Sequence, residues 1–131
     1  MVYIFLGVLI GIVILGIILL FLYGTKRKPK LSKDRIGYYQ KEIKKCVYSS
    51  PQDKIIQYDK ILNYILKDLG YEGNLADQLK QNPKEIKDIQ TIWKLHKLRN
   101  RLAHELSPIA NNILLNESKN FEKELFKLLE I

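Results

Sequence analysis

Charge is absent from the start of this 131-residue chain, because the first 23 residues include no Asp, Glu, Lys or Arg. Cysteine is also scarce: Cys46 stands alone, which excludes an intramolecular disulfide and a thiolate-rich zinc site. Two histidines and no tight pair of carboxylates leave no metal-ligand spacing, so we expect neither a metal nor a cofactor. No glycine-rich phosphate loop or nucleophile motif occurs. Period-two alternation is missing too, which argues against β-strands.

The uncharged stretch Val2–Tyr23 is long enough to cross a bilayer. Its 22 residues would form a helix of roughly 33 Å, close to the thickness of the hydrocarbon core. A cleaved signal peptide would have a basic start, a shorter apolar run and a small-residue cleavage site. A soluble core helix or an interfacial helix would have a polar face. None of these features is present, so the sequence predicts a transmembrane helix over residues 1–24.

Positive charge follows the span at once, in the linker of residues 25–31. Four residues of this linker are expected to contact anionic lipid headgroups: Lys26, Arg27, Lys28 and Lys30. Since positive charge stays on the cytoplasmic side, we expect a single-pass protein of the inner or plasma membrane, with its N-terminus outside and its domain in the cytoplasm. Residues 24–35 have a surplus charge of +5 and residues 36–131 only +3. The domain's charge is therefore weak support for nucleic-acid binding.

Residues 32–131 have the pattern of one helical domain. Four residues are suited to cap its helices at their N-termini: Ser32, Ser50, Asn74 and Asn82. Gly70 is expected to end the second helix in a left-handed conformation. The capping-box pattern that begins at Asn82 predicts a long helix to about Glu105, and a last helix is expected from about Asn116 to Leu129. The predicted fold class is all-α: one N-terminal transmembrane helix followed by a small bundle of four to five helices.

The segment Trp93–Glu105, WKLHKLRNRLAHE, places polar groups on a face that should pack. On a helical wheel Lys97 and Arg101 lie on the solvent arc, whereas His96 and Arg99 lie within the apolar side. His96 is interpreted as a core histidine with its hydrogen bonds satisfied. Arg99 cannot lose its charge, so it needs a partner. That partner is a carboxylate or carbonyl of the same domain, a second copy of this helix, or a phosphate.

The run Arg99-Asn100-Arg101-Leu102-Ala103-His104 resembles the signature of the HEPN family, in which an arginine and a polar residue precede a histidine. The wider run LHKLRNRLAHE, with the turn Gly70–Gly73 before it, is similar to that of small membrane-anchored bacterial proteins. The resemblance covers roughly residues 53–105. It implies a HEPN-like helical bundle that often dimerises. In catalytic members of the family, the motif helices of two copies form one metal-independent endoribonuclease site.

The resemblance also assigns roles to residues. His104 would be the general acid or base, Arg99 would hold the scissile phosphate, and Asn100 would orient His104 or the phosphate. Lys97 and Arg101 would contact the RNA backbone. The expected partners are therefore the lipid bilayer, a second copy of the chain, RNA, and a protein partner of unknown identity.

Three interpretations of this motif remain open: an endoribonuclease, a non-catalytic interaction module in which the same residues form a structural network, and coincidence in an unrelated bundle. The first two differ in what His104→Ala would do. An enzyme would lose cleavage with little loss of stability, whereas a structural network would lose about 1–3 kcal/mol. Dimerisation through Gly7 and Gly11 of the span, a GxxxG pair, is an alternative to pairing through the domain.

Overall fold

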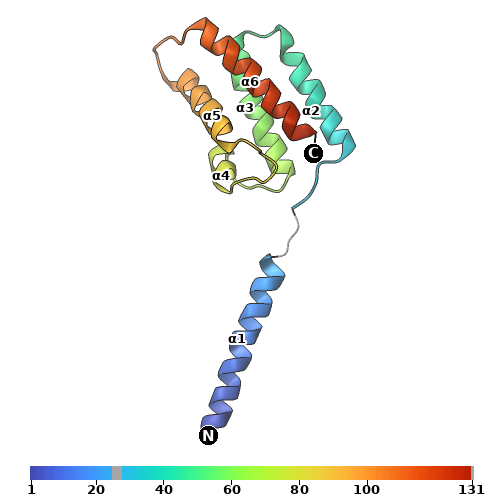
Figure 1. The fold of residues 1–131 in the computed structure, drawn as a ribbon, viewed down its shortest axis with the longest axis vertical. Helices are drawn as coiled ribbons and strands as arrows, with labels where there is room; N and C mark the ends of the chain where they lie inside the picture. Colours follow the sequence, from blue (N-terminus) through green and yellow to red (C-terminus); the bar gives the residue numbers. More distant parts are fainter. Residues whose placement is uncertain (25–27, 131) are drawn as a thin grey trace.

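The computed structural model describes residues 1–24 and 28–130, and this part of the chain is helical without a β-strand. One apolar N-terminal helix is followed by a bundle of five α-helices and one short 3-10 helix (Figure 1). The predicted all-α fold class is thus confirmed. The apolar helix, α1, spans Val2–Gly24. It is long and apolar enough to cross a membrane, and none of its residues is buried, unlike the core helix of a soluble protein.

The elements of the domain are α2 (Lys33–Lys45), η1 (Cys46–Tyr48), α3 (Pro51–Asp68), α4 (Leu75–Lys80), α5 (Ile89–His104) and α6 (Asn111–Leu129). The bundle is arranged around α3, which packs against each of the other helices of the domain. Its central position follows from its apolar stripe, in which Ile55, Leu62 and Ile65 are fully buried. The helices α2, α4, α5 and α6 cover this stripe and complete one core (Figure 1).

Most helix ends lie where the capping residues predict them. The side chains of Ser32, Ser50 and Asn74 each accept a hydrogen bond from the backbone N–H three residues later, so these N-caps are confirmed. Gly70 follows the end of α3 with φ +82°, as predicted. A side chain at Gly70 would also collide with Pro29, because its Cβ would lie 2.8 Å from the proline Cδ. This close approach holds the segment after the span against the end of α3.

The predicted start of the long helix at Asn82 is wrong. Asn82 has φ 52° and donates its backbone N–H to the carbonyl of Leu79, so it ends α4 and does not cap a new helix. The carboxylate of Glu85, expected to close a capping box, instead accepts a hydrogen bond from the Tyr71 hydroxyl at 2.7 Å. The chain therefore stays irregular until Asp88, which is the true N-cap of α5.

The last helix begins at Asn111, earlier than the predicted Asn116. Leu114 is 7% exposed and extends the buried stripe of Phe121 and Leu125 by about two turns. Ala110 stands at the N-cap position and offers no side-chain hydrogen bond, so burial of Leu114 accounts for the extra turns.

The cap of α5 gives the domain a specific sensitivity to acid. Thr91 donates its backbone N–H and its hydroxyl to the carboxylate of Asp88, and these bonds lower the pKa of Asp88. A lowered pKa means that this stabilisation is complete above the pKa of an unfolded aspartate and is lost as the pH falls through the folded value. Asp88→Asn keeps a capping acceptor but does not titrate.

We therefore expect the wild type to lose more stability than Asp88→Asn between about pH 5 and pH 3. The measurement is urea unfolding of the full chain in neutral detergent, followed by the fluorescence of Trp93, the single tryptophan. Equal losses in the two proteins would show that this cap does not contribute.

Candidate functional site

The helix α5 carries most of the residues that the sequence singles out, and it lies at an edge of the bundle (Figure 1). It packs against α3, α4 and α6, with Ile92 and Leu95 buried in the core. At its C-terminal end the backbone N–H of Glu105 donates to the carbonyl of Arg101 at 2.8 Å. One side of α5 is therefore fixed to the core and the other faces solvent.

Four polar side chains link α5 to α3 and form what we call the polar cluster: Asp59, His96, Arg99 and Asn100. Asp59 of α3 is 6% exposed and His96 of α5 is 8% exposed. His96 Nδ1 lies 2.8 Å from Asp59 Oδ1, and Arg99 Nε lies 3.6 Å from Asp59 Oδ2. One buried carboxylate thus binds the imidazole and balances the charge of the guanidinium.

The hydrogen bonds of the polar cluster follow one consistent direction. Arg99 Nη1 donates to Asn100 Oδ1 at 3.2 Å, and this bond turns the amide so that Asn100 Nδ2 lies 3.3 Å from His96 Nε2. An amide nitrogen only donates, so we assign Nε2 as an acceptor and place the imidazole hydrogen on Nδ1, facing Asp59. The hydrogen on Nδ1 is then the one that the Asp59 carboxylate accepts.

Arg99 is only partly used by the polar cluster. Its Nε is buried without a hydrogen-bond partner, because 3.6 Å to the Asp59 carboxylate is too long for a hydrogen bond. The side chain as a whole is still 35% exposed. The guanidinium is thus held by charge at its inner side, while its outer side is open to an anion.

His104, the last residue of α5, stands apart from this cluster. It is exposed, and in the part of the chain that the structure describes its side chain forms no hydrogen bond or ion pair. Lys97 and Arg101 are exposed as predicted, and Arg101 Nε donates to Glu105 Oε2 at 3.1 Å. The fold does not use His104, so its imidazole is available to a ligand or a partner.

The structure brings Arg99 and Asn100 together and leaves His104 apart from them. In the motif-based interpretation Asn100 orients His104 or a phosphate, whereas in this chain its amide bonds to Arg99 and His96. The prediction that His96 is a satisfied core histidine is confirmed. Of the expected membrane-surface residues, Lys28 and Lys30 are exposed, and two lie outside the described residues: Lys26 and Arg27.

Sequence reasoning missed Asp59, the residue on which the polar cluster depends. A signal was present, because Asp59 lies four residues after Ile55 and three before Leu62 and so falls on the buried stripe of α3. A carboxylate on a packing stripe needs a cationic or donating partner just as Arg99 does.

Within residues 1–24 and 28–130, no group of three or more His, Cys, Asp or Glu side chains could hold a metal ion. Comparison of the chain with models of known protein families, with curated proteins and with solved structures gives no match. Its function has to be inferred from its residues and their geometry.

Removing the shared carboxylate should destabilise the domain strongly. Asp59→Ala leaves the charge of Arg99 and the N–H of His96 without a partner, and we expect a loss of about 2–3 kcal/mol in the free energy of unfolding. Gln57→Ala, at an exposed position of the same helix, should change it by less than about 0.5 kcal/mol. Urea unfolding of the full chains in neutral detergent measures both, and similar values for the two variants would contradict a structural role for Asp59.

Proposed function

We propose that this chain is a single-span membrane protein whose cytoplasmic, HEPN-like domain pairs with a second copy through α5 and associates with RNA. The apolar and unburied α1 supports the anchoring. The basic residues after the span, which include the exposed Lys28 and Lys30, support an orientation with the N-terminus outside. The observation that carries the role of α5 is that His104 is exposed and unused by the fold, on the same helix as the partly exposed Arg99.

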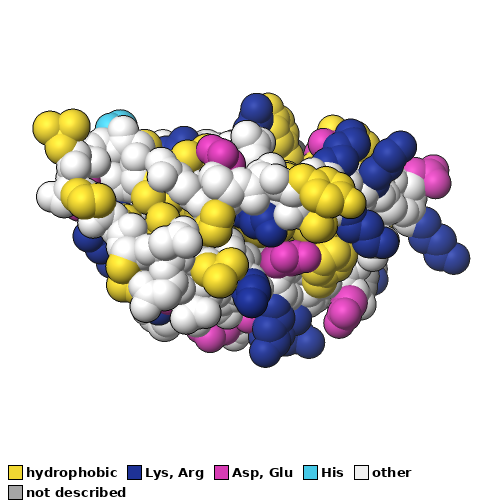
Figure 2. Space-filling model, turned by 90° about the horizontal axis from the view of Figure 1, so that it is seen from above, with side chains coloured by type: hydrophobic (Ala, Val, Ile, Leu, Met, Phe, Trp, Pro, Cys, Tyr) yellow, Lys and Arg dark blue, Asp and Glu magenta, His cyan; other side chains and the backbone are white. Residues whose placement is uncertain are grey.

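Exposed apolar side chains near His104 support pairing at this end of the domain. Leu106 is fully exposed just after α5, and Ile113 at the start of α6 is 48% exposed. Leu102 and Ile109 beside them are only partly buried. Figure 2 views the domain from above and shows hydrophobic side chains at several separate places on this face, among polar ones. Such side chains lose contact with water when a second copy covers them.

The cationic side chains of α5 support association with RNA. Lys97 and Arg101 lie on the outer face of the helix and are exposed, where they can contact phosphates. Arg99 adds a guanidinium whose fork suits a phosphate. The near balance of charge in the rest of the domain favours weak binding, which pairing of two copies would reinforce.

Catalysis of RNA cleavage is the second candidate, and the freedom of His104 favours it. His104 follows Arg99 by five positions, which on a helix is a rotation of about 140° and a rise of about 7.5 Å. One copy cannot place both side chains on one phosphate, whereas two facing α5 helices can. His104 of one copy would then take the proton of the 2′-hydroxyl as this oxygen bonds to the adjacent phosphorus, and the bond from phosphorus to the 5′-oxygen would break. The 5′-oxygen would leave with a proton from water, and Arg99 of the other copy would stabilise the charge on the phosphate. Asn100 would keep Arg99 in place.

The two histidines of α5 offer a matched test. His104→Ala should change the free energy of unfolding by less than about 0.5 kcal/mol, because the side chain has no partner in the fold. His96→Ala should lower it by about 1–3 kcal/mol, because Asp59 and Asn100 lose their bonds. Cleavage of RNA by the full chain in detergent with EDTA, lost in His104→Ala, would establish the enzyme. RNA binding without cleavage would support the non-catalytic module. The absence of both binding and cleavage would contradict any role with RNA.

Pairing through the end of α5 predicts that Leu106→Asp makes the protein monomeric without loss of stability. Tyr48→Asp is the matched control, because Tyr48 is 98% exposed at another place on the domain. Light scattering of the full chain in detergent gives the oligomeric state. If Leu106→Asp stays dimeric and the double variant Gly7→Leu with Gly11→Leu is monomeric, the span drives the dimer and pairing through α5 is wrong.

A further inference from the structure

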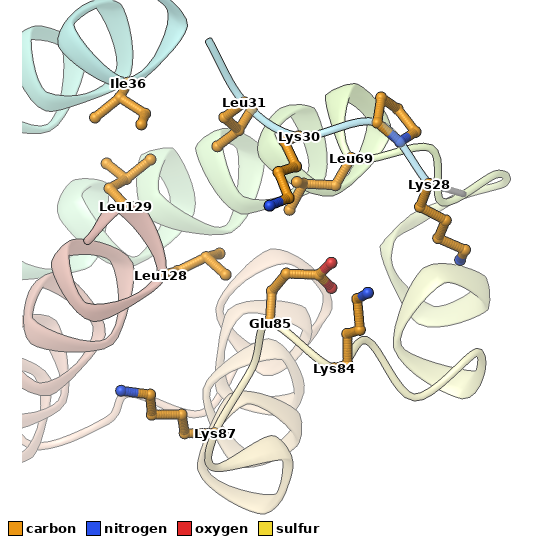
Figure 3. A pocket seen from close by; sticks show the side chains of 11 residues that line it. Lys28, Lys30, Leu31, Ile36, Leu69, Lys84, Glu85, Lys87, Leu128 and Leu129 are labelled. Atoms are coloured by element: carbon orange, nitrogen blue, oxygen red, sulfur yellow. The ribbon is translucent and has the colours of Figure 1, made fainter. Parts of the chain in front are cut away.

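A cavity of about 410 Å³ opens at the end of the domain where the chain arrives from α1 (Figure 3). Five of its lining residues are large and apolar, and they come from the segment before α2, from α2 and from the ends of α3 and α6: Leu31, Ile36, Leu69, Leu128 and Leu129. Its cationic part comes from four lysines: Lys28, Lys30, Lys84 and Lys87. Figure 3 shows Lys28 and Lys84 on one side of the cavity, Leu128 and Leu129 on the other with Lys87 below them, and Leu69 beside Lys30. The cavity is thus lined by cationic and apolar side chains together.

The positive charge of this cavity is not balanced by the fold. All four lysines are exposed, and among the residues that the structure describes none of them forms an ion pair with a carboxylate. Lys28 lies over the ring of Tyr71, with its Nζ 3.1 Å from the ring centre. The one acidic residue of the lining, Glu85, accepts a hydrogen bond from the Tyr71 hydroxyl. The lining therefore has a net charge of +3 and no internal counter-charge within salt-bridge distance of the lysines.

The position of the cavity relative to the bilayer follows from chain length. Lys28 is four residues beyond Gly24, the last residue of α1, so the two lie at most about 14 Å apart whatever path the chain takes. Pro29 lies close to Gly70 and Leu31 packs against the core, so this segment lies against the domain. With α1 in a membrane, the mouth of the cavity therefore stands next to the lipid headgroups.

We propose that this cavity binds an anionic phospholipid of the surrounding bilayer, with the headgroup phosphate among the lysines and the upper part of an acyl chain against the leucines. A lipid with these two parts matches both kinds of lining side chain. A free phosphate would leave the apolar side chains uncovered, and a zwitterionic lipid such as phosphatidylcholine would bring its own cationic group next to the lysines. A whole phospholipid is larger than the cavity, so the rest of the lipid stays in the membrane. The proposal rests on the anchoring of α1 proposed above and is independent of α5.

The test is retention of lipid by the full chain reconstituted in nanodiscs of phosphatidylcholine mixed with phosphatidylglycerol. Native mass spectrometry after release from the discs reports which lipid stays bound. We expect one phosphatidylglycerol per chain, no retained phosphatidylcholine from discs of that lipid alone, and no retained ion when inorganic phosphate is added to those discs. Recovery of the chain in discs tests the anchoring separately, so failure of the anchoring and failure of lipid binding are distinguishable.

Two kinds of variant separate the cavity from general attraction to a charged membrane. Lys30→Glu with Lys84→Glu should reduce the ratio of lipid-bound to free chain at least tenfold. Lys41→Glu with Lys119→Glu, exposed positions outside the cavity, changes the net charge equally and should retain the lipid. Leu31→Trp keeps every charge but fills the space between the apolar side chains of the cavity, and it should also abolish retention of the lipid. Equal retention by the two charge variants, retention by a folded Leu31→Trp chain, or retention of phosphate in place of lipid would each overturn the proposal.

Discussion

Asp59 places a carboxylate in the middle of α3, where only 6% of the residue is exposed. A charge in such a position is strongly destabilising unless a cation and hydrogen-bond donors reach it. His96 and Arg99 reach it from α5, so these contacts and the packing of Ile92 and Leu95 together fix the register of α5 on α3. A shift of α5 by one turn would separate these partners. Because these contacts are made by the middle of α5, the last turn of the helix extends beyond the polar cluster, and His104 is exposed to solvent. The structure of the candidate site is in this sense a consequence of where one carboxylate is buried.

Local signals in the sequence were enough for the fold class and for most helix starts. Ser32, Ser50 and Asn74 act within three residues of their own position, so no knowledge of the rest of the domain is needed. Asn82 was ambiguous because asparagine suits both an N-cap and a left-handed residue after a helix. The choice between them depended on Tyr71, whose hydroxyl takes the carboxylate of Glu85 away from the capping box. Contacts between segments that are distant in sequence decide such cases.

The candidate site divides in the same way. The helical wheel shows that Arg99 needs a partner, and it leaves three kinds of partner open. It does not identify the partner, because the wheel of α5 contains no information about which residue of α3 lies opposite. A helical wheel also does not show how far along α5 the neighbouring helices extend. The exposure of His104 at the end of α5 could therefore not be predicted from the sequence. The direction of a side chain around the helix axis can be read from the sequence, whereas the neighbours that it meets along the axis depend on how the helices pack.

The contact of Pro29 with Gly70 has a consequence for symmetry. It joins the domain to the chain near the N-terminal end of α5, and the 16 residues of that helix carry His104 about 24 Å toward the opposite end of the domain (Figure 1). If α1 anchors the domain in a membrane as proposed, two copies in one bilayer can bring these far ends together only side by side, with their two-fold axis along the membrane normal. They would meet by lateral diffusion. The amount of chain per area of membrane, and not its amount per volume of cytoplasm, would then set the fraction that is paired.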